Sequence, residues 1–194
     1  MDLGSVAVVA LIAGIAGGAV GAALVGTVEG MMRQRQQPAV GRWTVAHAQT
    51  VSLQGLDPDS RKVVSLARQE AIQNGHSYIG SENLAMALRL YSTPALSKIW
   101  SQLAIDTDTL RRRIEAAVPP ILGPTPSEGD FTPRISRIVA MAGTLAAERK
   151  REDAPPELVL LALADEGGGT GARALASLGA TAQRIREIVD GPMS

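Results

Sequence analysis

The sequence has 194 residues, with 19 basic and 19 acidic side chains, 3% aromatic residues and no cysteine. A formal net charge of zero and few aromatic rings argue against a nucleic-acid partner, which needs basic surfaces and stacking platforms. The absence of cysteine excludes disulfides, thiolate catalysis and cysteine zinc sites, and the abundance of Ala and Leu indicates a mainly helical soluble part.

The first feature along the chain is an uncharged apolar run over residues 3–28. About 20 apolar residues cross the hydrocarbon core of a bilayer, so this run predicts a transmembrane helix. A cleaved signal peptide is the alternative, but it would need basic residues before the run, where Asp2 stands instead. Arg33, Arg35 and Arg42 follow the run, and the positive-inside rule then places the rest of the chain in the cytoplasm. We therefore expect a single-pass membrane protein.

Small residues are spaced regularly within this anchor, which we assign to residues 1–30. Gly14 with Gly18, and Gly17 with Gly21, form two GxxxG pairs, a spacing that lets helices approach closely in lipid. One interpretation is packing on another membrane protein or self-association into a homo-oligomer. The other is a glycine-rich anchor with no specific partner. A polar tether over residues 31–55 follows.

An internal repeat occupies the remainder of the chain. Residues 56–114 align with residues 131–189 at a shift of 75, without a gap, and the apolar pattern is helical in both copies. Each copy predicts four helices, in repeats 56–118 and 131–190, with a Pro- and Gly-rich linker at 119–130. The predicted fold class is all-α, with about eight helices.

The first copy carries clear helix boundary signals. Asp57 and Pro58 predict the start of a helix that runs to about Asn74, where Gly75 stops it. Further helices are expected from residue 81, over about 95–103, and from Asp106 or Thr107 to the Pro119–Pro120 pair. The second copy repeats this pattern from Thr132 and Pro133.

The turn before the second helix is a candidate functional feature. We expect Ser81 to cap that helix and Glu82 to place a negative charge at its positive end. Tyr78 and Ile79 are expected to fill the core, and His76 to be a packed, hydrogen-bonded side chain.

Three separated motifs carry a resemblance to a known family. "GHSYIGSENLAMAL" at 75–88, "DFTPRISRIVAMA" at 130–142 and "EGGGTGARALASLGA" at 166–180 resemble, in order, the Clp N repeat domain of Clp-type protein unfoldases. In the second copy the first of these motifs has diverged to "REDAPPELVLLAL". The resemblance covers about residues 56–189 and implies a double-repeat helical domain that binds adaptors and substrate segments.

The resemblance also implies particular site residues. In some family members a Glu at the position of Glu82, and its counterpart at Glu157, binds the guanidinium of phosphorylated arginine, beside a helix N-terminus suited to phosphate. Ser81 and Glu82 match the family motif, with Ser for the usual Thr, whereas Glu157 matches by register only. Pro155 and Pro156 remove N–H donors, so Glu157 is expected to be the poorer site.

Three functions compete at this point. The first is a membrane-anchored module that recognises a protein or peptide: a substrate, an adaptor or a component of a Clp machine. The second is a structural or regulatory membrane protein that assembles through its glycine-rich helix. The third, an enzyme, has no support, because the sequence contains no P-loop, HExxH or nucleophile-elbow motif. We expect no catalysis, no cofactor and no metal, and the basic runs 111–113 and 149–151 are interpreted as solvated helix faces.

Overall fold

The computed structural model describes residues 52–118, 126 and 130–191. The described part is all-helical, as predicted, and its β-type pairing is limited to two isolated bridges. Its helices are α3 (Pro58–Gln73), α4 (Ser81–Leu90), α5 (Pro94–Leu103), α6 (Thr107–Glu115), α7 (Pro133–Glu148), α8 (Pro156–Glu166), α9 (Thr170–Ser177) and α10 (Ala182–Asp190).

The predicted transmembrane helix and its four glycines lie outside the described residues. Within the described ranges, no helix combines the length and the apolar character that crossing a bilayer requires.

The helices follow the repeat that the sequence predicts. The first residues of α3 and α7, of α4 and α8, and of α6 and α10 are each 75 positions apart, and those of α5 and α9 are 76 apart. Most of the helix ends carry the boundary signals that the sequence predicts. Asp57 accepts a hydrogen bond from the Ser60 N–H at 2.7 Å, and Gly75, with φ +67°, follows the last turn of α3 in the left-handed region.

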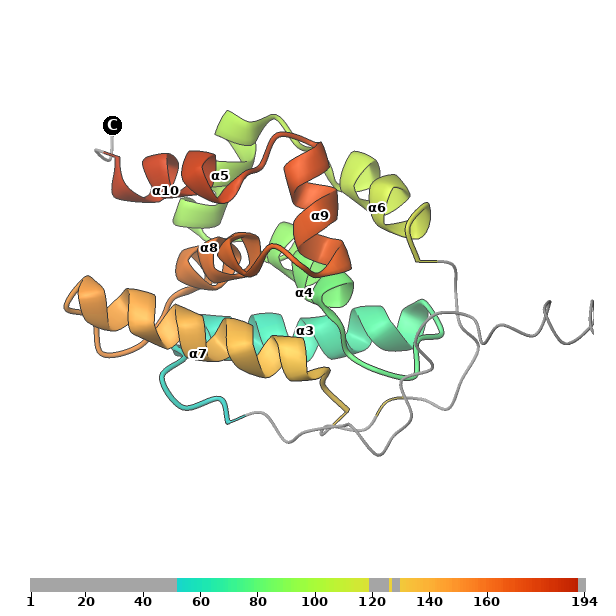
Figure 1. Ribbon diagram of the computed structural model, residues 1–194, viewed down its shortest axis with the longest axis horizontal. Coiled ribbons are helices and arrows are strands. Elements are labelled where there is room, and N and C mark those ends of the chain that lie inside the picture. Colours follow the sequence, from blue (N-terminus) through green and yellow to red (C-terminus); the bar gives the residue numbers. More distant parts are fainter. Residues whose placement is uncertain (1–51, 119–125, 127–129, 192–194) are drawn as a thin grey trace, which may run out of the picture. The chain divides into compact units, whose positions relative to one another are not determined.

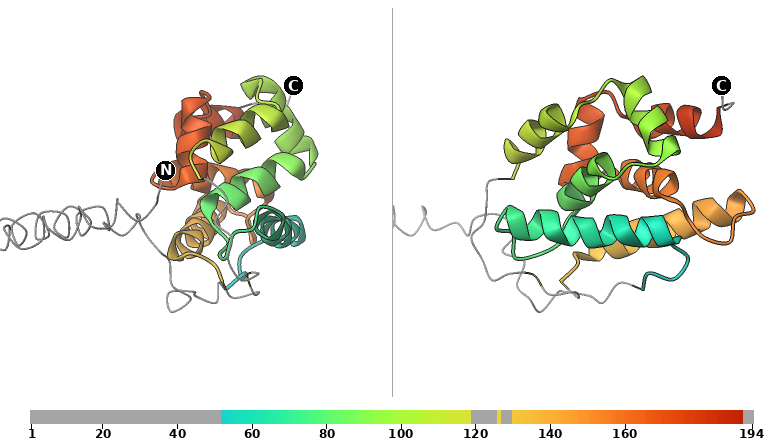
Figure 2. Two further views of the ribbon diagram at one scale, coloured as in Figure 1. Left: turned by 90° about the vertical axis from the view of Figure 1, so that its right-hand side faces the viewer. Right: turned by 180° about the vertical axis from the view of Figure 1, so that it is seen from behind.

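The helices form three layers (Figure 1). The pair α4 and α8 lies in the middle, with α3 and α7 on one side and the remaining four helices on the other; the rotated views in Figure 2 show the same order. The middle layer is the most buried: every residue from 81 to 88 in α4 and from 158 to 163 in α8 is buried. In α3, Val63, Ala67 and Ala71 form an apolar stripe that is almost fully buried.

The two repeats are joined by a reciprocal exchange of backbone hydrogen bonds. The segment before α3 pairs with the turn before α8, through Asp57 N–H to Ala154 O at 3.1 Å and Ala154 N–H to Gly55 O at 2.7 Å. The segment before α7 pairs in the same way with the turn before α4, through Thr132 N–H to Ile79 O at 3.1 Å and Ile79 N–H to Asp130 O at 2.8 Å. Each residue in one pair of hydrogen bonds lies 75 positions from its counterpart in the other pair. The two repeats are therefore related by pseudo-two-fold symmetry.

Candidate functional site

The turn before α4 is built differently from the expectation for Ser81. Gly80 is the N-cap of α4 and Ser81 is its first helical residue, so the prediction that Ser81 caps this helix is wrong. The Ser81 hydroxyl instead accepts a hydrogen bond from the Gly171 N–H at 3.2 Å. The Ser81 side chain points to α9 because α9, from the other repeat, packs directly on this end of α4. Ser81 therefore joins the two repeats.

Glu82 is buried, although a first-turn Glu is ordinarily solvated. Its residue is 5% exposed, and its Oε2 accepts a hydrogen bond from the Ser81 hydroxyl at 3.4 Å. Its Oε1 is buried and has no hydrogen-bond partner among the described residues. The carboxylate folds back over Gly80, where an added Cβ would lie 2.2 Å from Oε1. Burial raises the pKa of Glu82, an effect that the neighbouring His76 and Arg134 oppose.

His76 and Asn83 complete the polar part of this turn. The Asn83 Oδ1 accepts a hydrogen bond from the Gly80 N–H at 3.0 Å, so its amide group donates to His76 Nδ1 at 3.1 Å. His76 is 4% exposed and stacks on Tyr78, as a packed side chain should. Burial, together with the Glu82 carboxylate, raises the pKa of Tyr78 to about 12. Asn83 therefore closes the turn, because its side chain joins the Gly80 N–H to His76.

A cavity of about 210 Å³, the Glu82 pocket, opens beside this turn. It lies between the C-terminal end of α3, the first turns of α4 and the last turns of α6. Its walls combine aliphatic side chains with polar groups of both charges. The lining residues are Asn74, His76, Glu82, Asn83, Met86, Arg111, Ile114, Glu115 and Val118.

The second repeat holds an equivalent cavity of about 190 Å³, the Glu157 pocket. Six of its lining residues lie 75 positions after six that line the Glu82 pocket: Arg149, Arg151, Glu157, Leu158, Val189 and Asp190.

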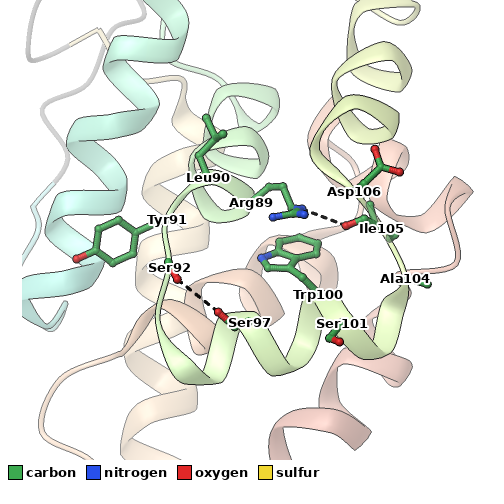
Figure 3. Close-up of a pocket in the computed structure, with 10 residues that line it drawn as sticks. All are labelled: Arg89, Leu90, Tyr91, Ser92, Ser97, Trp100, Ser101, Ala104, Ile105 and Asp106. Carbon is green, nitrogen blue, oxygen red and sulfur yellow. Dashed lines mark hydrogen bonds between the residues drawn. The ribbon is translucent and has the colours of Figure 1, made fainter.

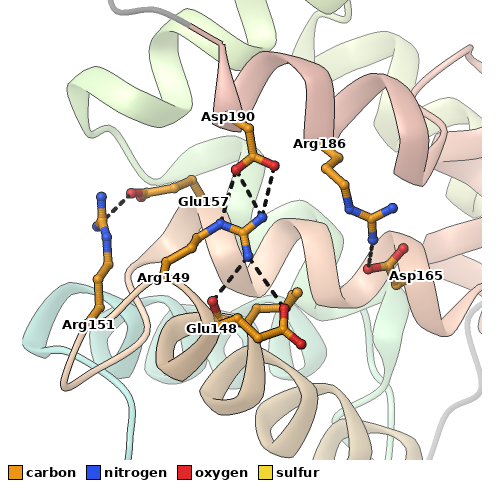
Figure 4. A network of polar contacts seen from close by, with 8 residues as sticks. Glu148, Arg149, Arg151, Glu157, Asp165, Arg186 and Asp190 are labelled. Atoms are coloured by element: carbon orange, nitrogen blue, oxygen red, sulfur yellow. Dashed lines mark hydrogen bonds and ion pairs between the residues drawn. The ribbon is translucent and has the colours of Figure 1, made fainter.

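The chemistry of the Glu157 pocket differs, as Figure 4 shows. The Glu157 carboxylate lies 3.4 Å from Arg151 Nη1, and Arg149 forms a two-pronged ion pair with Asp190 at 2.9 to 3.0 Å. The α8 N-terminus also has two fewer N–H donors, because Pro155 is its N-cap and Pro156 its first residue. The pocket thus keeps its shape, but its carboxylate already has a partner.

A third hollow, of about 460 Å³, lies between the end of α4, α5 and the start of α6 (Figure 3). Arg89 sits 5.7 Å above the Trp100 ring and donates from Nε to the Ile105 carbonyl at 3.0 Å, while the indole N–H donates to the Leu88 carbonyl at 3.1 Å. These groups tie the three helices together. Because their directional hydrogen bonds are made within the chain, this hollow is a weaker candidate than the Glu82 pocket.

Comparison with known proteins establishes the family. The model of the Clp repeat (R) N-terminal domain matches residues 55–178 and 130–193, and the chain belongs to this family. The chloroplastic chaperone protein ClpC1 of rice is 32% identical over 128 residues, 66% of this chain and 14% of that protein. The chaperone protein ClpB of Oceanobacillus iheyensis is 28% identical over 131 residues, 67% of this chain and 16% of that protein. The matched region thus spans about one-seventh of these relatives.

Solved structures agree on the fold. The N-terminal domain of the chaperone ClpD from Arabidopsis thaliana aligns with a TM-score of 0.56 at 16% identity, over 70% of this chain and 94% of that one. The Hsp104 N-terminal domain from Candida albicans aligns with a TM-score of 0.57 at 14% identity, over 70% of this chain and 89% of that one. At such identities the likeness concerns the fold alone, and it confirms the fold implied by the sequence motifs.

Proposed function

We propose that this chain is a protein-recognition module that binds a segment of a partner protein at the Glu82 pocket, without catalysing a reaction. The observation that carries this proposal is that Glu82 lines a cavity while its buried Oε1 has no hydrogen-bond partner among the described residues. Unpaired buried carboxylate oxygens are unfavourable, and a donor from a ligand would relieve that penalty. The family supports the proposal, because its members carry this domain at the N-terminus of Clp chaperones.

The chemistry of the pocket favours an arginine side chain on the partner. A guanidinium offers five N–H donors, enough for the Glu82 carboxylate and further acceptors in the walls. Met86, Ile114 and Val118 provide the aliphatic surface that its methylene stem needs. Arg111, whose Nη1 lies 3.3 Å from Glu70, is the cation in the lining that would meet a phosphate on a phosphorylated arginine.

Peptide titration tests this site. Arginine-containing peptides, with and without arginine phosphate, are titrated against the wild-type chain and the Glu82→Gln and Glu157→Gln variants. Loss of a charged hydrogen bond to the ligand should weaken binding by about 1.5–3 kcal/mol, or about tenfold to a hundredfold, in Glu82→Gln. Glu157→Gln should change affinity little, because Arg151 already pairs with that carboxylate. Equal affinities for wild type and Glu82→Gln would remove Glu82 from the binding site.

Membrane attachment is part of the same proposal. Its support is the uncharged run at residues 3–28 and the arginines that follow it, which favour a binding domain on the cytoplasmic face. Protease added outside intact cells should leave the domain uncut, and ready digestion would reverse the proposed orientation.

The alternative is a structural or regulatory membrane protein, and its binding partners would distinguish it from a recognition module. Such a protein would act through Gly14, Gly17, Gly18 and Gly21. Purification from membranes should recover protease subunits or their substrates if recognition is the function. Recovery of membrane proteins alone, with loss of association when the glycines are enlarged, would favour the alternative.

A further inference from the structure

The arginine run 111–113 does not form one uniform solvated face. Arg111 pairs with Glu70 at 3.3 Å, and Arg112 donates to the Thr109 hydroxyl at 3.2 Å on its own helix. Arg113 instead turns toward the other repeat, where its Nε donates to the Ser177 hydroxyl at 2.7 Å. One member of the run is therefore held against α9.

Arg113 lines a hollow of about 320 Å³ between α6 and α9. Three alanines line the hollow, and a second guanidinium, that of Arg173, lines it from α9. Its described lining contains no acidic side chain, and neither arginine forms an ion pair with a described residue. The full lining set is Arg113, Ala116, Ala117, Thr170, Arg173 and Ala174.

Ser177 fixes the position of Arg113. The serine hydroxyl donates its own proton to the Ala174 carbonyl at 2.7 Å, so it can only accept from the Arg113 Nε. The terminal amino groups of Arg113 make no described hydrogen bond and remain available for another acceptor. A guanidinium oriented by a neutral hydroxyl has no negative charge beside it, unlike one that is held by a carboxylate.

The internal repeat shows that the fold does not require this arrangement. The counterparts of Arg113 and Ala174, 75 residues away, are Ile188 and Ile99. At that equivalent place between α5 and α10, Ile99 is buried and Ile188 packs against the core. In the second half an isoleucine thus replaces Arg113, while Lys98, the counterpart of Arg173, lines the Glu157 pocket together with Ile99 and Ile188.

We propose that Arg113 and Arg173 form a binding site for a carboxylate or phosphate group presented by an acidic or phosphorylated segment of a protein partner. Two guanidiniums in one hollow repel each other, and an anion between them removes that repulsion while accepting from both forks. A protein segment fits better than a nucleic acid, because the hollow has no aromatic platform and the chain has no net positive charge. The site is separate from the Glu82 pocket and does not depend on it.

Arginine side-chain NMR on the full chain tests the proposal. The Nε–H signals are followed during titration with inorganic phosphate, a glutamate-rich peptide and a phosphoserine peptide. Signals of Arg113 and Arg173 should shift saturably together with a peptide. Arg113→Ala and Arg173→Ala should each weaken peptide binding by about tenfold or more, the effect of one lost charged hydrogen bond. Arg112→Ala is the matched control, because it removes the same charge from the same turn and should leave the affinity nearly unchanged.

The outcomes separate the sources of the anion. Tighter binding of a peptide than of inorganic phosphate, lost in the Arg113 and Arg173 variants, supports the proposal. Saturation by inorganic phosphate with no gain for either peptide would assign the hollow to a free anion and overturn the protein partner. Equal losses in all three arginine variants, or shifts spread over every exposed arginine, would show non-specific charge attraction and overturn the site.

Discussion

At the scale of single residues, the turn before α4 combines a buried carboxylate with close backbone packing. Glu82 lies over Gly80, and Ser81 contacts the α9 backbone. A carboxylate that is buried with an unpaired oxygen destabilises the folded chain when ionised, unless a ligand supplies a donor. Both the protonation of Glu82 and ligand binding at Glu82 should therefore affect the stability of the folded chain.

Glu82→Gln should change how stability depends on pH. Because burial raises the pKa of Glu82, the folded chain keeps this proton to a higher pH than the unfolded chain does. The stability tied to it is fully present below the ordinary pKa of about 4.3 and decreases as pH rises toward the raised pKa. The Tm of Glu82→Gln minus that of wild type should therefore increase as pH rises from about 4. A difference that is constant with pH would contradict a raised pKa. Glu157→Gln, at the ion-paired counterpart, is the matched control.

Two glycine substitutions should have opposite effects on stability. An added Cβ at Gly171 would lie 2.1 Å from the Ser81 carbonyl oxygen, a backbone atom that cannot move without shifting α4. Gly171→Ala should destabilise the chain by about 1–3 kcal/mol, the usual effect of overpacking. Gly143, inside α7, has open space around its Cβ position, so Gly143→Ala should stabilise by about 0.5–1 kcal/mol. Urea unfolding measures both, and stabilisation by Gly171→Ala would contradict the close contact of α9 with α4.

At the scale of elements, the repeats depend on each other. The turn before each middle helix receives its backbone partners from the segment that leads into the other repeat. Those N–H and C=O groups would lose these partners if one repeat unfolded alone. We expect the two repeats to unfold together.

A core substitution in one repeat should therefore affect the other. Leu160 in α8 is fully buried, and Leu160→Ala should cost about 2–5 kcal/mol. Native-state hydrogen exchange of slowly exchanging amides in α4 should accelerate by the same factor as that of amides in α8. Acceleration confined to α7–α10 would show that the repeats open independently.

The elements were largely predictable from sequence, whereas the details of the site were not. Helical periodicity, Asp57, Gly75 and the shift of 75 residues are local or repeated signals, and the helices follow them. The role of Ser81 was missed because its partner, Gly171, lies 90 residues away. Arg113 is exposed, as predicted, but its hydrogen bond to Ser177 and its position beside Arg173 were not predictable, because they depend on the packing of α9 beside α6.

At the scale of the whole molecule, the double repeat presents related cavities with different chemistry. In the Glu82 pocket, one carboxylate oxygen of Glu82 has no hydrogen-bond partner among the described residues, whereas in the Glu157 pocket Arg151 pairs with the corresponding carboxylate. The hollow between α6 and α9 has two arginines, whereas at the equivalent positions Ile188 replaces Arg113 and Lys98 replaces Arg173. The two halves of this pseudo-symmetric fold therefore present surfaces with different chemistry. Such a surface favours a partner bound in one orientation, with a cationic group at one site and an anionic group at the other.

The most direct test of recognition at the Glu82 pocket is the methionine-methyl NMR spectrum of the full chain during titration with an arginine-containing peptide. Met86 lines the pocket, whereas Met141 lies on α7 and serves as the internal control. The account predicts that the Met86 signal shifts saturably in the wild-type chain, that Met141 stays unchanged, and that Glu82→Gln weakens the Met86 response about tenfold or more. A peptide that binds while the Met86 signal stays in place would contradict recognition at this pocket.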